Sequence, residues 1–242
     1  MPPCCGGELD SSRLPSEYVL PVGLHLDAPA APELEEGYEV RWRDEDEPPH
    51  YFFYAQVSVL RVERLLAAAL ALMPPRCHAV LELRRCDELM EREPGGPAQD
   101  RFVSALVPRA AVAAVLDRYR FQILHDGMAG FGFYDPDSPL EVFLDDHKLL
   151  SLFAAGLEPF EGLLAELGVP HRGHLDTVLD LEHEHHGLVA VPDRTECKRH
   201  EWLRRRKYDV NWFGQTIRRR LRMRLEPQLS GGGLPDADAD EG

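Results

Sequence analysis

Cysteine is scarce in this chain and has no regular spacing. The 242 residues contain five cysteines, Cys4, Cys5, Cys77, Cys86 and Cys197, an odd number without a repeated C-x-x-C pair. Small disulfide-stabilised domains and zinc ribbons both need paired cysteines at suitable spacing, so neither class is indicated. We therefore expect a protein of a reducing compartment, the cytoplasm.

Long apolar runs are also missing. No stretch approaches the roughly 20 apolar residues that cross a bilayer as a helix, and the first residues, MPPCCGGELDSSR, lack the apolar part of a secretory signal. No membrane span is predicted. Apolar residues nevertheless make up 44% of the chain, which is ordinary for a folded globular protein and predicts a substantial core.

The chain also lacks the short motifs of several common catalytic sites. The segment GFGF at residues 130–133 has neither the Lys-Ser/Thr of a P-loop nor the glycine spacing of a dinucleotide-binding loop. No serine lies in a G-x-S-x-G turn, and no cysteine has the context of a nucleophile. These absences argue against P-loop, dinucleotide-dependent and serine-hydrolase classes.

Charge is unevenly distributed along the chain. Residues 1–192 hold 15 Lys and Arg against 33 Asp and Glu, whereas residues 193–225 hold 12 against four. The remaining residues to the end of the chain are acidic again. The net charge of −15 therefore conceals a basic segment between two acidic ones, which is the clearest anomaly of the composition.

The apolar pattern predicts an α+β domain over residues 48–190. Aromatic and β-branched residues from Tyr51 indicate a strand, a leucine- and alanine-rich stretch ending at Pro74 indicates a helix, and alternation over residues 77–85 indicates another strand. Strand, helix and strand recur over residues 102–134, with one helix expected at 110–124. We expect a mostly antiparallel sheet with helices on one face, two ferredoxin-like halves being an alternative arrangement within that class.

The flanks differ from this domain. Residues 1–47 are rich in proline and acidic residues and are expected to be extended or disordered, with at most an edge strand. Residues 191–226 form the basic helical segment. Residues 227–242 form an acidic tail that we expect to be disordered.

The central apolar stretch, residues 121–153, predicts the end of a helix, a strand and a β-hairpin. Gly127 is interpreted as the cap of that helix, and residues 145–148 as the tip of the hairpin. The later segment HLDTVLDLEHEHH, residues 174–186, predicts the last strand of the domain because leucine alternates with acidic residues.

Two polar clusters contain residues suited to binding a metal ion. His183 and His185 would project from the same face of the last strand, where neutral imidazoles can share Zn²⁺ or another divalent cation. Asp145 and His147, with Asp146 between them, can join this site if the hairpin tip folds beside the strand end. Aspartate beside histidine also orients a general base, but tight turns select the same residues, so a structural role stays open.

The basic segment predicts an amphipathic helix over residues 210–225. Apolar residues recur in steps of three or four, at Val210, Phe213, Ile217, Leu221 and Leu225. The basic and aromatic residues suited to phosphates or to an acidic surface are Arg204, Arg205, Arg206, Lys207, Trp212, Arg218, Arg219, Arg220 and Arg222. The partner would be a nucleic acid, an acidic protein or a second copy of the chain.

Together these features predict a non-enzymatic interaction or regulatory protein that binds through its basic C-terminal helix. The alternative is a metal-dependent hydrolase that uses the H-x-H strand end and the hairpin tip.

Overall fold

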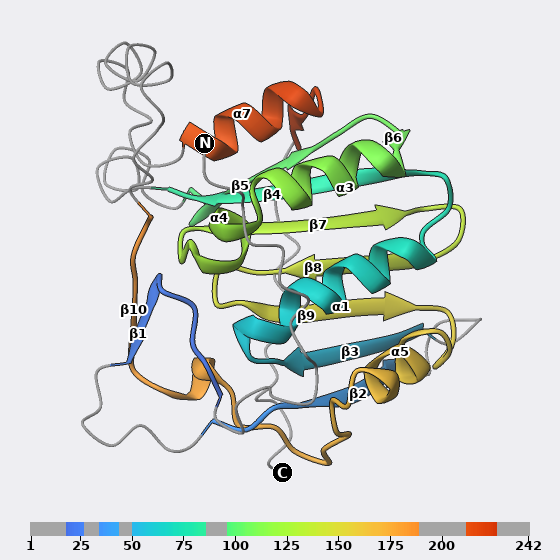
Figure 1. Cartoon of the computed structure of the whole chain (residues 1–242), viewed down its shortest axis with the longest axis vertical. Coiled ribbons are helices and arrows are strands. Elements are labelled where there is room, and N and C mark those ends of the chain that lie inside the picture. The colour runs from blue at the N-terminus through green and yellow to red at the C-terminus, as the bar shows by residue number, and fades with distance from the viewer. Residues whose placement is uncertain (1–17, 27–33, 44–49, 86–95, 189–211, 227–242) are drawn as a thin grey trace, which may run out of the picture.

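One large sheet with helices on one face makes up most of the protein. The computed structural model describes residues 18–26, 34–43, 50–85, 96–188 and 212–226 (Figure 1). The strands of this sheet are, in chain order, β2 (Gly37–Arg43), β3 (His50–Gln56), β4 (Arg76–Arg84), β5 (Gln99–Val103), β6 (Val107–Pro108), β7 (Ala129–Asp135), β8 (Leu140–Leu144), β9 (Leu149–Ala154) and β11 (Arg224–Leu225). Their spatial order is β11-β5-β4-β7-β8-β9-β3-β2, with β6 paired to β4, and all these pairs are antiparallel.

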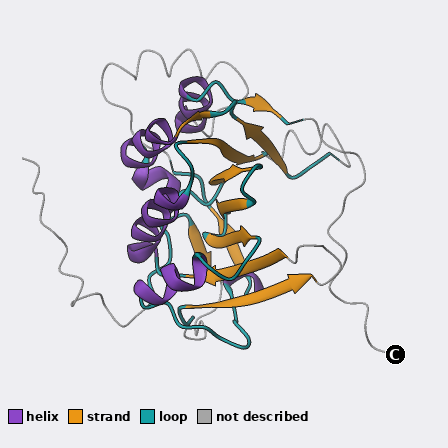
Figure 2. Ribbon diagram, turned by 90° about the vertical axis from the view of Figure 1, so that its right-hand side faces the viewer, coloured by secondary structure: helices purple, strands orange, loops and turns teal. Residues whose placement is uncertain are grey.

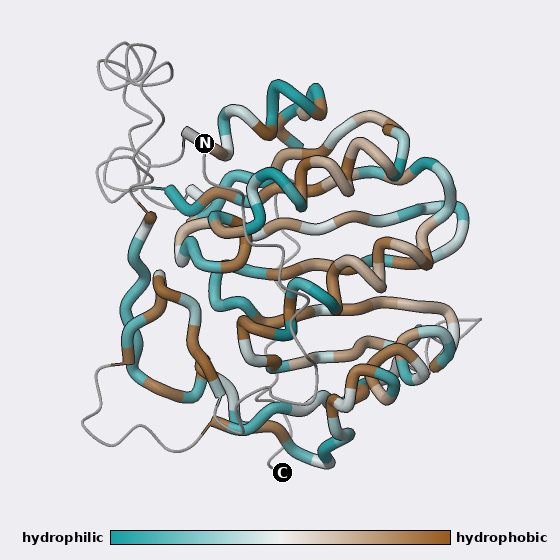
Figure 3. The backbone as a smooth tube through the Cα atoms, viewed as in Figure 1, coloured by the Kyte–Doolittle hydropathy of each residue, from teal (hydrophilic) through white to brown (hydrophobic). Residues whose placement is uncertain are grey.

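Helices and strands lie in two layers. The helices are α1 (Val59–Leu72), α3 (Arg109–Arg118), α4 (Arg120–His125), α5 (Phe160–Glu166) and α7 (Trp212–Arg220). Figure 2 shows most of the helices on one side of the strands, and in Figure 3 the strands are mainly brown and white whereas the turns at the sheet ends are mainly teal. The predicted α+β class with a mostly antiparallel sheet is confirmed.

The core lies between the two layers. Helix α1 buries six side chains, among them Val62, Leu65 and Ala69, and it ends at Leu72, two residues before Pro74. Phe53 of β3 and Phe131 of β7 face the same core and are almost fully buried. The hydrophobic effect on this shared interior, about 25 cal/mol per Å² of apolar surface buried, drives the helices onto the sheet.

The helix predicted at 110–124 is divided in two. Helix α3 ends at Arg118, and Tyr119 (φ −111°, ψ 20°) separates it from α4. After the break, α4 packs against α1 and α3, and residues 126–128 connect it to β7. The sequence has neither proline nor glycine at this point, so its periodicity gave no sign of the break.

Nothing in the strand order divides the sheet into two ferredoxin-like halves. Strands β3 and β4, which flank α1, are separated by β7, β8 and β9, whereas β5 and β7 are separated only by β4. The two strand–helix–strand units therefore make different crossovers within one continuous sheet. Strand β2 of the proline-rich flank is the edge strand next to β3.

The prediction of a last strand over residues 174–186 is mostly wrong. Within residues 174–186 the chain forms a single 3₁₀ turn, η2 (Val178–Asp180), and then only the short strand β10 (His183–His185). The side chains of Thr177 and Asp180 form a capping box that stabilises the turn. Strand β10 pairs with β1 (Leu24–Leu26) in a separate two-stranded ribbon beside the large sheet (Figure 1).

The basic helix is also shorter than its apolar pattern predicts within the described residues. Helix α7 ends at Arg220 because Arg222 adopts a left-handed conformation (φ 51°), and Met223 N–H then donates to the Arg218 carbonyl at 2.8 Å. This is the bonding pattern of a Schellman motif, normally signalled by glycine. The chain continues as β11, so Leu225 is in a strand and is exposed.

Among the described residues, no helix has the length and apolar character required to cross a bilayer.

Candidate functional site

Three histidines from distant parts of the chain meet at one end of the large sheet. His147 lies at the tip of the β8–β9 hairpin, and His183 and His185 lie on β10. The centroid of the His147 ring is 5.1 Å from that of His183 and 4.6 Å from that of His185. The centroids of the His183 and His185 rings are 5.1 Å apart. One ring nitrogen of each lies within 4.8 Å of the others.

A close contact between two glycines places β10 beside the hairpin tip. Gly23 N–H donates to the His125 carbonyl at 2.8 Å, and Gly127 N–H donates to the His186 carbonyl at 3.1 Å. A Cβ atom on Gly127 would lie 2.1 Å from the Gly23 oxygen, which no side chain could tolerate. Gly127 was predicted to cap α4, but the structure requires a glycine there for this backbone approach.

The proton position on each ring follows from its hydrogen bonds. His185 Nδ1 lies 2.5 Å from the Gly127 carbonyl, and His183 Nδ1 lies 2.7 Å from the Leu181 carbonyl. A carbonyl only accepts, so each Nδ1 must donate. His147 Nδ1 faces a carboxylate oxygen of Asp146 at 3.1 Å. In the neutral form of each ring, Nε2 is therefore the nitrogen that can offer a lone pair.

Asp146 lies beneath the histidines and is 3% exposed. Its carboxylate accepts hydrogen bonds from Gln99 Nε2 at 2.8 Å and from Arg84 at 3.2 Å. These donors come from β5 and β4, so the large sheet supports the carboxylate that orients His147. Neither Gln99 nor Arg84 was selected from the sequence, and no local pattern marks them.

The ionisable side chains of this cluster change one another's pKa values. Burial alone would lower the pKa of His147, but the hydrogen bonds and charges of Asp145 and Asp146 outweigh it and raise that pKa to about 9. Burial would raise the pKa of Asp146, but its contacts with His147, His185 and Gln99 hold it well below the ordinary value. The pKa of His185 is lowered, mainly by burial.

Lys148, the residue after His147, is a buried cation beside this cluster. Its side chain is fully buried, and Nζ donates to the Ala129 carbonyl at 2.5 Å and to the Asp145 carbonyl at 3.2 Å. Burial lowers its pKa to about 8 despite the nearby carboxylates of Asp126, Asp145 and Asp146. Lys148 also has a left-handed backbone (φ 63°), consistent with the predicted tip of the hairpin.

The geometry of the cluster suits a small divalent cation. Bonds of about 2.0–2.1 Å to a tetrahedral zinc ion would place two ligand nitrogens roughly 3.3 Å apart, and one nitrogen of each ring already lies within 4.8 Å of the others. Imidazole nitrogens suit Zn²⁺ and other first-row ions. Asp145 and Asp146 face the Nδ1 edge of His147, where they can support the ring. Together with His147 they form a second group whose ligand atoms lie within 4.8 Å of one another, so Asp145 stays a predicted ligand.

The predicted binding residues of the basic segment are not brought to this cluster by any described contact. Arg204, Arg205, Arg206 and Lys207 lie outside the described residues, and Trp212 begins α7. Phe213, Ile217 and Leu221 are buried in the main core, so the apolar stripe of α7 already packs against its own chain. Arg219, Arg220 and Arg222 are exposed.

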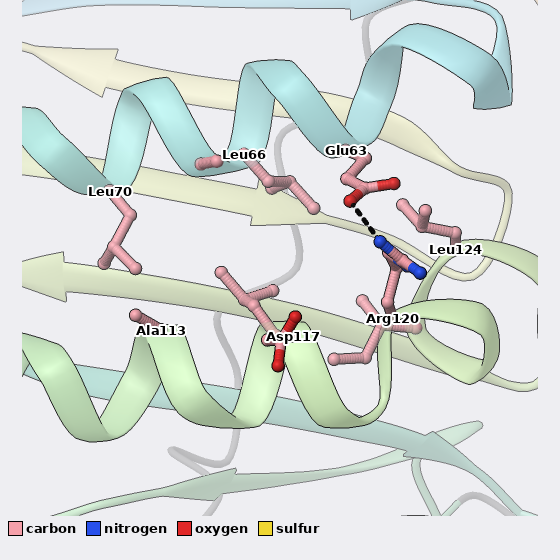
Figure 4. Close-up of a pocket in the computed structure, with 10 residues that line it drawn as sticks. Glu63, Leu66, Leu70, Ala113, Asp117, Arg120 and Leu124 are labelled. Carbon is pink, nitrogen blue, oxygen red and sulfur yellow. Dashed lines mark hydrogen bonds and ion pairs between the residues drawn. The ribbon is translucent and has the colours of Figure 1, made fainter. Parts of the chain in front are cut away.

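A separate hollow of about 220 Å³ lies between α1 and the α3–α4 pair (Figure 4). Its walls are mostly apolar, including Leu66, Leu70 and Ala113, and Arg120 donates to Glu63 across its mouth at 2.9 Å. This volume is below the roughly 300–1,000 Å³ of typical ligand sites. Its charged groups also neutralise each other, so we regard it as incomplete packing between surface helices.

No family model matches this chain, and comparison with curated proteins and with solved structures finds no significant similarity. The functional argument therefore depends on the residues themselves.

Proposed function

We propose that this protein is a metal-dependent hydrolase in which His147, His183 and His185 bind a zinc-like divalent ion. The observation that carries the proposal is the convergence of three ring nitrogens within 4.8 Å of one another. Each of these rings also uses Nδ1 in a hydrogen bond to a fixed acceptor, which leaves Nε2 for the ion.

Three protein ligands leave a fourth position of a tetrahedral ion for water. A bound zinc ion lowers the pKa of that water to about 7 and so supplies hydroxide at neutral pH. The side chains of His147 and Asp145 are 20% and 29% exposed, so solvent reaches this end of the sheet. Asp146 keeps His147 oriented, and Asp145 is the nearby accessible carboxylate that can accept a proton.

The test begins with metal content. The full-length protein, stripped with chelator and reloaded, should bind one equivalent of Zn²⁺ by mass spectrometry and calorimetry. Co²⁺ should give the visible absorption of a tetrahedral site. The metal-loaded protein should hydrolyse a chromogenic ester or phosphodiester, and chelation should abolish that activity.

The double variant His183→Ala/His185→Ala should lose the stoichiometric ion and the hydrolysis. His186→Ala is the matched control, because this histidine follows the same strand but is 52% exposed and pairs with Glu184. Loss of metal in the control, or stoichiometric metal in the double variant, would contradict the assignment. Metal binding without hydrolysis would reject the enzymatic part alone.

Binding through the basic segment is a second candidate function, favoured by the exposed arginines of α7. Because the apolar stripe is buried, the contact would use arginines and not the stripe. A nucleic acid, an acidic protein or a second copy of the chain would each present the required negative charge. We place either activity in the cytoplasm, since the five cysteines have no paired spacing.

A further inference from the structure

Arginines surround an open hollow at the C-terminal end of α7. The hollow has a volume of about 360 Å³ and is lined by Gln215, Arg218, Arg219, Arg222, Met223 and Arg224. Four of these six residues are arginines and none is a carboxylate. Strand β11 is the edge strand next to β5. In Figure 1, α7 lies at the top of the view, above β5, well separated from the β1–β10 ribbon that carries two of the histidines.

The local fold determines where these arginines lie. The guanidinium of Arg218 is 3.7 Å from the centroid of the Phe102 ring and donates to Gln215 Oε1 at 3.1 Å. Stacking on an aromatic face and a side-chain hydrogen bond hold this group in one orientation. The left-handed backbone of Arg222 turns the chain back, so that Arg224 on β11 lies beside the helix end.

Three of the four arginines that line the hollow are not neutralised by described carboxylates. Within the described part of the chain, Arg219, Arg222 and Arg224 form no ion pair, and all three are exposed. The adjacent carboxylate, Glu226, pairs with Arg101 at 3.0 Å. Clustered like charges repel and are unfavourable unless an anion binds them, so this arrangement is suited to a ligand with several negative charges.

We propose that this hollow binds a compact phosphate-bearing anion, of the size of a di- or triphosphate group. Guanidinium groups donate in pairs to phosphate oxygens, and the three exposed guanidinium groups of Arg219, Arg222 and Arg224 suit adjacent phosphates. A long nucleic acid is disfavoured because residues 1–192 carry 33 acidic against 15 basic residues, which would repel a polyanion that extends beyond the hollow. The inference goes beyond the second candidate function, because its ligand is a small anion and not a macromolecule, and it does not depend on the metal site.

The experiment measures binding of inorganic tripolyphosphate to the full-length protein by calorimetry at low salt. Arg219→Gln should weaken binding roughly tenfold, as expected for a lost charge-assisted contact. Arg220→Gln is the matched control because Arg220 is the next residue of α7, equally exposed, but does not line the hollow. It should change the affinity by less than about twofold, since only long-range charge is lost.

A second variant and two further ligands test whether the hollow recognises phosphate groups. Arg222→Asn should also weaken binding, and asparagine tolerates the left-handed backbone at this position. Equal affinity for ATP and tripolyphosphate would assign recognition to the phosphates, and tighter ATP binding would add a contact with the nucleoside; both results support the inference. Absence of tripolyphosphate binding, or equal losses in the Arg219 and Arg220 variants, would overturn it. Binding of a 20-nucleotide strand but not of tripolyphosphate would also overturn it while leaving the second candidate function in place.

Discussion

The histidine cluster and α7 both attract attention in the sequence, but they relate to their surroundings in opposite ways. The histidines are polar side chains held at the edge of the core, each with one ring nitrogen bound by a fixed acceptor. Helix α7 buries its apolar stripe and directs its charges outward. The first arrangement leaves one nitrogen of each ring without a bond to its own chain's fixed acceptors, whereas the second is how an ordinary surface helix packs.

This difference separates two kinds of sequence signal. A basic amphipathic pattern indicates a helix, and the same pattern fits a binding arm and a helix that packs on its own domain. A histidine pair alone is weak evidence for a metal site. The evidence becomes stronger when a third histidine ring and a supporting carboxylate lie beside the pair. The contrast therefore favours the metal site as the principal function and leaves the arginines of α7 as a separate site.

The largest expected effect tests whether α7 is part of the domain. Ile217 is fully buried in the main core, so Ile217→Ala should lower the free energy of unfolding by about 2–5 kcal/mol. Arg220→Gln on the same helix should change it by no more than about 0.5 kcal/mol. Chemical denaturation of both variants measures the difference. If both variants changed the free energy of unfolding by similarly small amounts, α7 would not be part of the domain core. Its difference from the histidine cluster would then not hold.

A second test concerns the backbone contact that positions β10. Gly127→Ala should lower the free energy of unfolding by about 1–3 kcal/mol and weaken Zn²⁺ binding, because the new Cβ would lie 2.1 Å from the Gly23 oxygen. Gly162→Ala within α5 is the control, since its Cβ would meet nothing within 4 Å. That change should stabilise the protein by about 0.5–1 kcal/mol. Unchanged metal affinity in Gly127→Ala would show that the histidines do not need this contact.

A third test removes the charge that supports His147. Asp146→Asn keeps the shape of the side chain but weakens its hold on His147 Nδ1 and on Arg84. We expect a loss of about 10–100-fold in Zn²⁺ affinity, the usual effect of removing a partner behind a metal ligand. Asp176→Asn is a suitable control because the Asp176 side chain is 83% exposed and, among the described residues, its carboxylate pairs only with the equally exposed His174. Calorimetric titration with Zn²⁺ distinguishes the two variants.

The smallest expected effect is a change of stability with pH. The pKa of His147 is raised to about 9 in the folded protein, above its ordinary value of about 6.5. The folded state therefore retains a proton on His147 that the unfolded state releases. Lys148, whose pKa is lowered to about 8, acts in the opposite direction but offsets only part of this effect, so metal-free stability should fall by on the order of 1 kcal/mol between pH 7 and pH 8.5. Zn²⁺ affinity should rise over the same range, since the ion displaces this proton. Chemical denaturation and Zn²⁺ titration at both pH values measure how metal-free stability and Zn²⁺ affinity change with pH. If both quantities rose, or both fell, the assignment of His147 as a ligand would be contradicted.

Much of the fold is predictable because its signals are local. Leucines at helical spacing and the following prolines indicated α1, alternation indicated β4, and the polar residues 145–148 indicated the hairpin tip. Predictions were wrong where a local pattern could be satisfied in another way. The alternating leucines of residues 174–186 lie in a capped 3₁₀ turn and a three-residue strand because Thr177 and Asp180 bond to the local backbone.

The candidate metal ligands were named from the sequence, but their supporting groups were not. Residue type selected His147, His183 and His185, since imidazole is a common metal ligand. Arg84, Gln99 and Lys148 act through contacts between strands that are distant in the chain. No spacing rule connects such residues, because sheet order and not sequence distance makes them neighbours.

The sequence by itself determined the α+β class, the hairpin tip and the division between an acidic body and a basic segment, because each follows from nearby residues. Only the tertiary structure decided that His147 meets His183 and His185. That meeting requires the Gly23 and Gly127 backbones to touch, and such a contact depends on how the ribbon docks against the sheet. Tertiary packing likewise decided that the stripe of α7 faces the core of its own chain, since an amphipathic pattern specifies a buried face but not the surface that buries it.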